Sequence, residues 1–254
     1  MPAHLRLLAL PLFLLSCAVS TPLALESYHA PQDVAQPVDR SQATNPVMAG
    51  ADPHAMVIDG KVWMYPTHSG GGGPLFHAYS SIDLRTWQDH GPVLTFADVA
   101  WIGDDGQPTH YAWAPAVARR GRSYYFYYSV GPQGKTPARL GVAVGSSPAG
   151  PFKDSGKPLL TGGNGFEAID PMVFFDPVSG KYFLYAGGSA GARLKVFELA
   201  PDMISFAREI RVDNPEHFTE GAFMHYYGGL YYLSYSSGGW RTSTYSSHYS
   251  TSTT

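Results

Sequence analysis

The sequence predicts an all-β fold built from repeated sheets, and three observations support this prediction. Aromatic residues make up 14% of the 254 residues, with 17 Tyr and 13 Phe. Gly (28) and Pro (21) are both frequent, whereas charged residues amount to only 15%. This composition is typical of many short strands joined by tight turns, rather than of long helices rich in Glu, Lys and Ala. The third observation is a pattern that recurs four times along the chain.

Each copy of the pattern reads as an apolar strand, a turn that contains Gly, and a second strand rich in aromatic residues, which together predict a hairpin. The four copies occupy residues 51–65, 113–129, 169–185 and 220–236. Third strands are predicted at 75–80, 140–145 and 194–199, and fourth strands near Val93, Pro158 and Ile210.

The spacing of the copies distinguishes between kinds of repeat. Their starts at Asp52, Ala114, Asp170 and Glu220 are 62, 56 and 50 residues apart. Units of roughly 40–50 residues with four strands each are typical of propeller blades. Helical repeats are the alternative, but Gly and Pro interrupt every candidate helix, and no apolar residues recur at helical spacing over three turns. The sequence therefore predicts a β-propeller of which about four blades are present.

Three of the four starts carry a carboxyl group, namely Asp52, Asp170 and Glu220. The first strand of each blade lines the central channel, so side chains at these starts should converge at one mouth of the channel. Pro follows both aspartates directly, which suits a strand entrance where no donor to the ladder is needed. Single acids at strand ends are usually solvated, but three at matching positions, each within apolar sequence, predict a shared site.

The N-terminal residues are predicted to be an export signal. Residues 1–6 are weakly positive, residues 7–15 are apolar, and small residues follow at Ser16, Ala18 and Ser20. The apolar run is too short to span a bilayer, so we expect a signal peptide at 1–20, a linker at 21–45 and the propeller domain at 46–254. An N-terminal core helix is the alternative, but the linker would separate such a helix from the domain. We expect the protein to be secreted or periplasmic.

The only cysteine, Cys17, lies inside this signal, so the exported domain has no disulfide. Residues 14–17, Leu-Leu-Ser-Cys, resemble a bacterial lipoprotein cleavage site, where the cysteine becomes lipid-modified. Anchoring to a membrane through Cys17 and free secretion are two open alternatives. The net charge is −3 and there is no basic run, so nothing indicates a nucleic acid as a partner.

Six short motifs, in the right order, resemble the family 43 glycoside hydrolases, which are five-bladed propellers. The motifs are Ala-Asp-Pro at 51–53, Ser-Ser-Ile-Asp-Leu-Arg-Thr-Trp at 80–87, Trp-Ala-Pro at 113–115, Gly-Val-Ala-Val-Gly-Ser-Ser-Pro-Ala-Gly-Pro-Phe at 141–152, Ile-Asp-Pro at 169–171 and Thr-Glu-Gly at 219–221. The resemblance runs from about residue 46 to 250. It implies an inverting glycosidase that acts on oligosaccharides or polysaccharides of plant cell walls, of the xylan or arabinan type.

The resemblance also implies a role for each acid. Asp52 would be the general base that activates water, Glu220 the general acid that protonates the leaving oxygen, and Asp170 the residue that orients Glu220 and adjusts its pKa. The chemistry agrees, because glycoside hydrolysis needs one ionised and one protonated carboxyl group on opposite sides of the bond. A third carboxylate nearby disfavours ionisation of the acid by like-charge repulsion.

Two tryptophans are candidates for substrate binding. Trp113 matches a family position near the sugar, where its indole would stack on the ring, and packing between blades is the alternative. Trp101, in a long loop, is predicted to line the cleft. His54 lies on the same strand face as Asp52 and fits equally well as a residue that fills the channel. The ten histidines show no zinc spacing. The resemblance implies no required cofactor, and it is compatible with a central calcium ion whose ligands the sequence does not place.

The C-terminal end departs from the family pattern. The fourth blade reaches its third strand at 244–251, so we expect a propeller that is incomplete at its C-terminus, with uncertain activity of its own. An inactive or carbohydrate-binding propeller is therefore one alternative function. A β-fructosidase is another, although those enzymes usually carry Asn-Asp-Pro-Asn, Arg-Asp-Pro and Glu-Cys where this chain has Ala-Asp-Pro-His, Ile-Asp-Pro and Glu-Gly.

Overall fold

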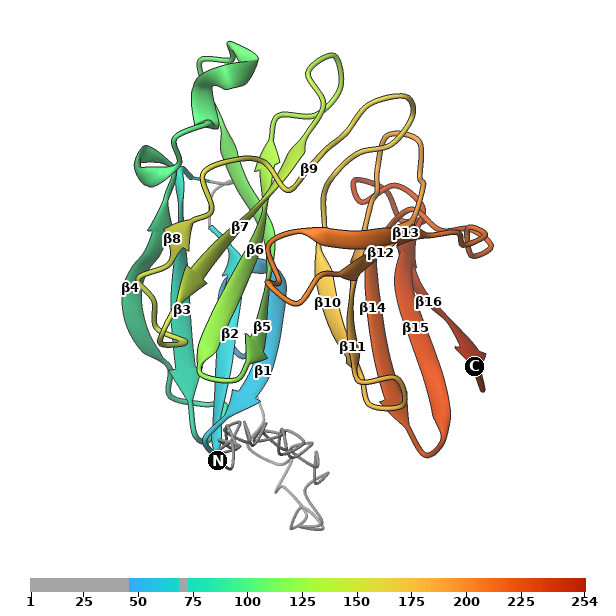
Figure 1. Cartoon of the computed structure of the whole chain (residues 1–254), viewed down its shortest axis with the longest axis horizontal. Coiled ribbons are helices and arrows are strands. Elements are labelled where there is room, and N and C mark those ends of the chain that lie inside the picture. Colours follow the sequence, from blue (N-terminus) through green and yellow to red (C-terminus); the bar gives the residue numbers. More distant parts are fainter. Residues whose placement is uncertain (1–45, 69–72) are drawn as a thin grey trace, which may run out of the picture. The chain divides into compact units, whose positions relative to one another are not determined.

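Four antiparallel sheets follow one another along the chain, and in each of them strands that are adjacent in sequence pair with each other (Figure 1). The computed structural model describes residues 46–68 and 73–254, all of which belong to one unit, Asp39–Thr254. The predicted signal peptide (1–20), the linker (21–45) and Cys17 lie outside the described residues, so export and anchoring stay predictions. In the part of the chain that is described, no helix is both long and apolar enough to cross a membrane.

The strand bounds follow the four repeats. The first sheet holds β1 (Ala51–Ile58), β2 (Lys61–Thr67), β3 (Leu75–Ser81) and β4 (Gln88–Thr95). The second holds β5 (Tyr111–Arg120), β6 (Ser123–Gly131), β7 (Arg139–Gly145) and β8 (Lys153–Asp154), and β9 (Leu160–Thr161) also pairs with β7. The third holds β10 (Met172–Asp176), β11 (Lys181–Ala186), β12 (Lys195–Leu199) and β13 (Phe206–Ile210). The fourth holds β14 (Glu220–Tyr227), β15 (Leu230–Ser237) and β16 (Ser246–Ser252).

The hairpins form where the turn residues permit them. Asp59 and Gly60, which join β1 to β2, have φ angles of 51° and 76°, and Gly228 and Gly229, which join β14 to β15, have 60° and 84°. Two successive residues with positive φ define the turn whose twist matches that of the flanking strands, and Asp-Gly and Gly-Gly pairs favour it. The two 3-10 turns, η2 (Phe96–Asp98) and η3 (Ile102–Asp105), lie between the first and second sheets in sequence.

Apolar side chains from successive sheets form three separate cores. The first core joins sheets one and two, and in it the ring of Phe76 packs edge-on against Phe126 and Tyr128, with centroids 5.2 and 5.9 Å apart. The second core joins sheets two and three around Tyr127 and Leu184, and the third joins sheets three and four. Each sheet therefore packs on the next one along the chain, as propeller blades do, and the predicted all-β propeller with four blades is confirmed.

Candidate functional site

The starts of the first strands are bulged, which turns their side chains toward the pocket described below. The pairing register shifts between Ala51 and His54 in the first blade, between Trp113 and Ala116 in the second, and between Glu220 and Phe223 in the fourth. One residue of each bulge has positive φ, and so does the residue before Pro171 in the third blade: Asp52 (45°), Ala114 (30°), Asp170 (53°) and Gly221 (67°). Bulges re-aim side chains and are frequent next to active sites.

This comparison corrects the sequence alignment of the repeats at Glu220. Gly221, not Glu220, has the left-handed conformation that Asp52 and Asp170 have in their blades. Glu220 pairs with Ser236 just as Trp113 pairs with Ser129, so Glu220 matches Trp113 in position. The prediction that all three acids occupy equivalent positions is therefore wrong by one residue at Glu220. In the other three blades a Pro follows the left-handed residue and marks its position in the sequence. The fourth blade has no such Pro, so nothing in its sequence marks where the bulge lies.

All three predicted acids nevertheless line one pocket of about 970 Å³, together with Trp113 and His54. Residues from all four blades contribute to its wall. The second strands and the loops that follow them add Thr67, His68, Gln133, Ser189, Ser236, Trp240, Arg241 and Tyr245. The convergence that the repeats predicted is thus seen in the described residues.

Asp52 is the most exposed of the three acids, and one hydroxyl group fixes it. Thr67 Oγ1, at the end of β2, donates a hydrogen bond of 2.9 Å to Asp52 Oδ2. The same oxygen accepts a 2.8 Å hydrogen bond from the backbone N–H of Ala114 in the second blade. Thr67 thereby ties the Asp52 carboxyl to the neighbouring blade.

Asp170 is the acid whose proton affinity responds to the charges of both other acids. Its own N–H donates to Ser129 Oγ at 3.0 Å, and its Oδ2 accepts the N–H of Gly221 at 3.1 Å. Burial, followed by the negative charges of Glu220 and Asp52, raises the pKa of Asp170 to about 8, although the bond from Gly221 opposes them. Asp170 therefore holds its proton into the neutral range.

Glu220 is buried, and both of its carboxyl oxygens accept hydrogen bonds from hydroxyl groups. The phenol of Tyr245 donates to Oε1 at 3.0 Å, and the hydroxyl of Ser189 donates to Oε2. Gly188 makes room for this side chain, because a Cβ at residue 188 would lie 2.5 Å from Glu220 Cβ. Burial, the charge of Glu220 and the hydrogen bond to it raise the pKa of Tyr245 to about 12, so this phenol remains a donor at neutral pH.

Two aromatic side chains, Tyr111 and Trp113, line the pocket beside the acids. The ring of Trp113 lies parallel to that of Tyr111, with centroids 5.7 Å apart and an interplanar angle of 6°. It rests directly on Gly131, where a Cβ would lie 2.3 Å from the indole. Trp113 is partly exposed to the pocket, so the predicted position near a sugar fits the structure. His54 lies deeper, and burial lowers its pKa to about 4 against a hydrogen bond involving the backbone of Val117, so its imidazole is neutral at neutral pH.

Trp101 does not reach the pocket, and its prediction as a cleft residue is wrong. Only 3% of its surface is exposed, and its indole N–H donates to Asp154 Oδ1 at 3.1 Å. Its ring stacks on Tyr128 at 6.2 Å, and the guanidinium of Arg139 lies 4.8 Å from its centroid. The segment that reads as a long open loop contains two 3-10 turns, which direct the indole into the first core.

The sequence interpretation missed the hydroxyl groups that position the acids. Thr67, Ser129 and Ser236 share one signal, because each lies near the end of the aromatic second strand of its blade. Ser189, Trp240, Arg241 and Tyr245 lie in connections between strands, where no periodic pattern marks them. Among residues 46–68 and 73–254, no group of three or more His, Cys, Asp or Glu side chains is placed to hold a metal ion.

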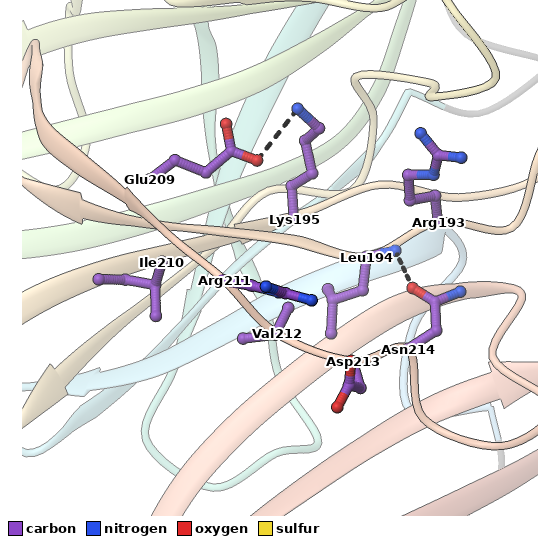
Figure 2. A pocket seen from close by; sticks show the side chains of 9 residues that line it. All are labelled: Arg193, Leu194, Lys195, Glu209, Ile210, Arg211, Val212, Asp213 and Asn214. Atoms are coloured by element: carbon purple, nitrogen blue, oxygen red, sulfur yellow. Dashed lines mark hydrogen bonds and ion pairs between the residues drawn. The ribbon is translucent and has the colours of Figure 1, made fainter.

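A second pocket, of about 640 Å³, lies along β12 and β13 and differs in character. Figure 2 shows its charged side chains, among them the ion pair of 3.1 Å between Lys195 and Glu209. The backbone N–H of Leu194 donates to Asn214 Oδ1 at 2.8 Å beside it. None of the three acids of the repeats lies in this pocket, so the first pocket is the candidate active site.

Fold and site together define a propeller with a carboxyl-lined pocket, and comparison with known proteins identifies the family. The family model for glycosyl hydrolases family 43 matches residues 43–254, and the chain belongs to this family of glycosidases. A β-D-galactofuranosidase of Aspergillus niger is 36% identical over 247 residues, which cover 90% of this chain and 69% of that protein. A xylosidase/arabinosidase of Bacteroides ovatus is 30% identical over 74% of this chain and 70% of its own length.

Solved structures agree with these relatives. A family 43 β-xylosidase/α-arabinofuranosidase from a compost microbial metagenome, described as a calcium-free form in complex with xylotriose, aligns with a TM-score of 0.66. It is 30% identical, and the alignment covers 80% of this chain and 74% of that one. The family 43 enzyme of Xanthomonas citri in complex with xylotriose aligns with a TM-score of 0.67 and 28% identity.

Proposed function

We propose that this chain hydrolyses O-glycosidic bonds in oligosaccharides or polysaccharides with inversion of configuration, and that Asp52, Asp170 and Glu220 do the chemistry. The observation that carries the proposal is that three carboxyl groups from three blades line one pocket, where burial and the charges of Glu220 and Asp52 raise the pKa of Asp170 to about 8. Inverting hydrolysis needs an acid that holds a proton and a base that does not, in the same site at the same pH.

Asp52 is suited to be the base. It is the most exposed of the trio, so water reaches the carboxyl group, and the hydroxyl of Thr67 donates to it and holds it in place. In the proposed reaction an Asp52 oxygen takes a proton from a water molecule as the water oxygen attacks the anomeric carbon. The bond from that carbon to the leaving oxygen breaks on the opposite face of the sugar.

Glu220 is suited to be the acid. It is buried, and hydroxyl groups that donate to both carboxyl oxygens hold it in place. In the reaction its proton passes to the leaving oxygen as the glycosidic bond breaks, which leaves the Glu220 carboxylate hydrogen-bonded to Ser189 and Tyr245. Asp170 holds its own proton at neutral pH and accepts the N–H of Gly221, so it fixes the backbone next to the acid.

The substrate class is proposed from the pocket wall and from the relatives. The stacked pair of Tyr111 and Trp113 offers a flat apolar surface to a sugar ring, and the exposed Trp240 extends this surface to the rim. The relatives are described as enzymes that act on xylosyl, arabinofuranosyl or galactofuranosyl groups. We propose xylan- or arabinan-type substrates for this chain and include galactofuranosides in the test.

A hydrolysis assay with two leaving groups tests the proposal. The chain is assayed on aryl xylosides, arabinofuranosides, galactofuranosides and fructosides, and then on an unactivated disaccharide of the sugar that it cleaves. Asp52→Asn should lose at least about 10³-fold in kcat for every substrate, because water activation is always needed. Glu220→Gln should lose a similar factor for the disaccharide but much less for an aryl glycoside with a good leaving group, which departs without a proton.

Matched controls are Asp104→Asn, at an exposed position outside the pocket, and Glu216→Gln, whose carboxyl pairs only with His217 on the surface. Both should keep normal turnover. Equal losses of Glu220→Gln with good and poor leaving groups would remove Glu220 from the role of acid. Binding of xylo- or arabino-oligosaccharides without hydrolysis of any substrate would favour a carbohydrate-binding propeller, and cleavage of fructosides alone would favour the fructosidase alternative.

A further inference from the structure

We propose that the hydroxyl groups of Ser189 and Tyr245 form a two-point clamp that orients the Glu220 carboxyl and stabilises its ionised form. This inference rests on the proposed role of Glu220 as the acid and adds two positioning residues to it. Tyr245 donates to Oε1 at 3.0 Å and Ser189 donates to Oε2. With one donor at each oxygen, the carboxyl plane is fixed in direction as well as in place.

The two donors come from different blades, which gives the clamp its geometry. Ser189 lies in the connection between β11 and β12 of the third blade, and Tyr245 lies directly before β16 of the fourth blade. Glu220 begins β14, so the clamp joins its own blade to the preceding one. A carboxyl group held from both sides cannot rotate freely, and a proton donor must point toward the leaving oxygen to act.

The backbone around Ser189 is adapted to this contact. Ser189 has a φ angle of 42°, which L-residues with a side chain seldom adopt, and Gly187 (128°) and Gly191 (91°) flank it. Gly188 leaves the space that the Glu220 side chain fills. A non-glycine residue in a left-handed conformation is strained and persists only where its surroundings determine it. Here that conformation accompanies the hydrogen bond of Ser189 to the acid.

The clamp acts on Glu220 through its hydroxyl donors, which favour the ionised carboxylate. Asp170 holds its own proton at neutral pH, so it adds no full negative charge beside the acid there. The other titratable or charged groups that line the pocket with Glu220 are Asp52, His54, His68, Tyr111 and Arg241. In the proposed step the carboxylate appears as the proton leaves, so the clamp stabilises the charge where it develops.

The test measures the acid directly as well as its turnover. In the full chain labelled with ¹³C at Glu side-chain carboxyls, the Glu220 resonance is assigned with Glu220→Gln and titrated by NMR. Tyr245→Phe and Ser189→Ala should each raise the pKa of Glu220 by about 0.5–1 unit. Ser189→Thr, which keeps a hydroxyl, should restore the unsubstituted value. Tyr249→Phe and Ser247→Ala, at exposed positions of β16, are the matched controls and should leave it unchanged.

Kinetics provide a second readout. Tyr245→Phe and Ser189→Ala should lower kcat about 10-fold or more on the unactivated disaccharide with little change in KM, and should move the alkaline limb of the pH–rate profile upward. An unmoved pKa of Glu220 in both variants would overturn the clamp, even in an enzyme that uses Glu220 as the acid. A raised pKa together with equal losses of Glu220→Gln on good and poor leaving groups would keep the clamp and remove the catalytic role of Glu220.

Discussion

At the scale of single residues, the three acids differ in what surrounds them. Asp52 faces the open pocket and accepts the Thr67 hydroxyl, Asp170 accepts a backbone N–H, and Glu220 is buried. Like groups in unlike surroundings acquire different proton affinities, which is how one site holds an acid and a base at the same pH. The raised pKa of Asp170 means that this carboxyl holds a proton near neutral pH.

This raised pKa predicts how stability changes with pH. The pKa of Asp170 is about 8 in the folded chain and near its ordinary value of 3.8 when unfolded, so the folded state binds its proton more tightly. The stability contributed by that proton is complete below about pH 3.8 and is lost as the pH rises through about 8. Asp170→Asn cannot ionise, so its free energy of unfolding relative to the unsubstituted chain should increase by about 3–4 kcal/mol between pH 5 and pH 8.

Urea unfolding of both proteins at pH 5, 6.5 and 8 measures this difference, with Asp104→Asn as the exposed control. A difference that stays constant over this range would mean that Asp170 titrates normally. The conclusion that the pocket keeps Asp170 protonated near neutral pH would then fail, whatever the kinetics show.

At the scale of elements, a left-handed residue at or just before the start of each first strand sets the direction of the acids. The left-handed residue is Asp52, Ala114 or Asp170 in three blades, each before a proline, and Gly221 in the fourth. Glu220 therefore enters the pocket from the position before the left-handed residue, as Trp113 does in its blade. One backbone motif thus presents two aspartates from the left-handed position and a glutamate from the position before it.

Substitution of Gly188 tests whether the position of Glu220 depends on the close approach of the third blade's connection to the fourth blade. Gly188→Ala would place a Cβ 2.5 Å from Glu220 Cβ and 3.1 Å from Glu220 Cα, closer than real contacts allow. We expect Glu220 to be displaced and kcat to fall by about 10²-fold, because a shift of about 1 Å has this effect in a catalytic site. Gly103→Ala is the control, since a Cβ there has nothing within 4 Å. Normal turnover of Gly188→Ala with unchanged stability would show that the loop adjusts freely.

The sequence predicted the elements better than it predicted their connections. Strands alternate and recur, so a local pattern marked every hairpin and placed Asp52, Asp170 and Trp113 at the pocket. The register at Glu220 was off by one residue, because a bulge inserts a residue that alternation does not show. Trp101 was misplaced because the 3-10 turns around it bury an indole in a segment without periodicity. Ser189 and Tyr245 were missed because their contacts to Glu220 span 31 and 25 residues of sequence.

At the scale of the whole molecule, hydroxyl groups at the ends of second strands link successive blades close to the pocket. Thr67 joins Asp52 of the first blade to the N–H of Ala114 in the second. Ser129 of the second blade accepts the N–H of Asp170 in the third, and its own hydroxyl lies 3.4 Å from the carbonyl oxygen of Ala114. These bonds satisfy backbone groups that the bulges remove from the ladders, and they hold the acids at fixed positions between blades.

Thr67→Val tests the role of these links. The substitution keeps the shape of a buried side chain but leaves the N–H of Ala114 without its acceptor and Asp52 without its donor. We expect the free energy of unfolding to fall by about 1–3 kcal/mol, and turnover to fall as well because Asp52 is released. Thr86→Val, at an exposed position in the first blade's connection, should change neither quantity. A Thr67→Val protein as stable and as active as the unsubstituted chain would rule out a linking role.

The central claim is that Asp52 activates a water molecule rather than attacking the sugar itself, while Glu220 supplies the proton. The most direct measurement is the anomeric configuration of the first sugar released, followed by ¹H NMR during hydrolysis of the substrate that the chain cleaves best. The account predicts that the released sugar initially has the anomeric configuration opposite to that of the substrate, and equilibrates only later by mutarotation. Initial release with retained configuration would contradict the account, because it would require a covalent glycosyl intermediate on a carboxylate of this pocket.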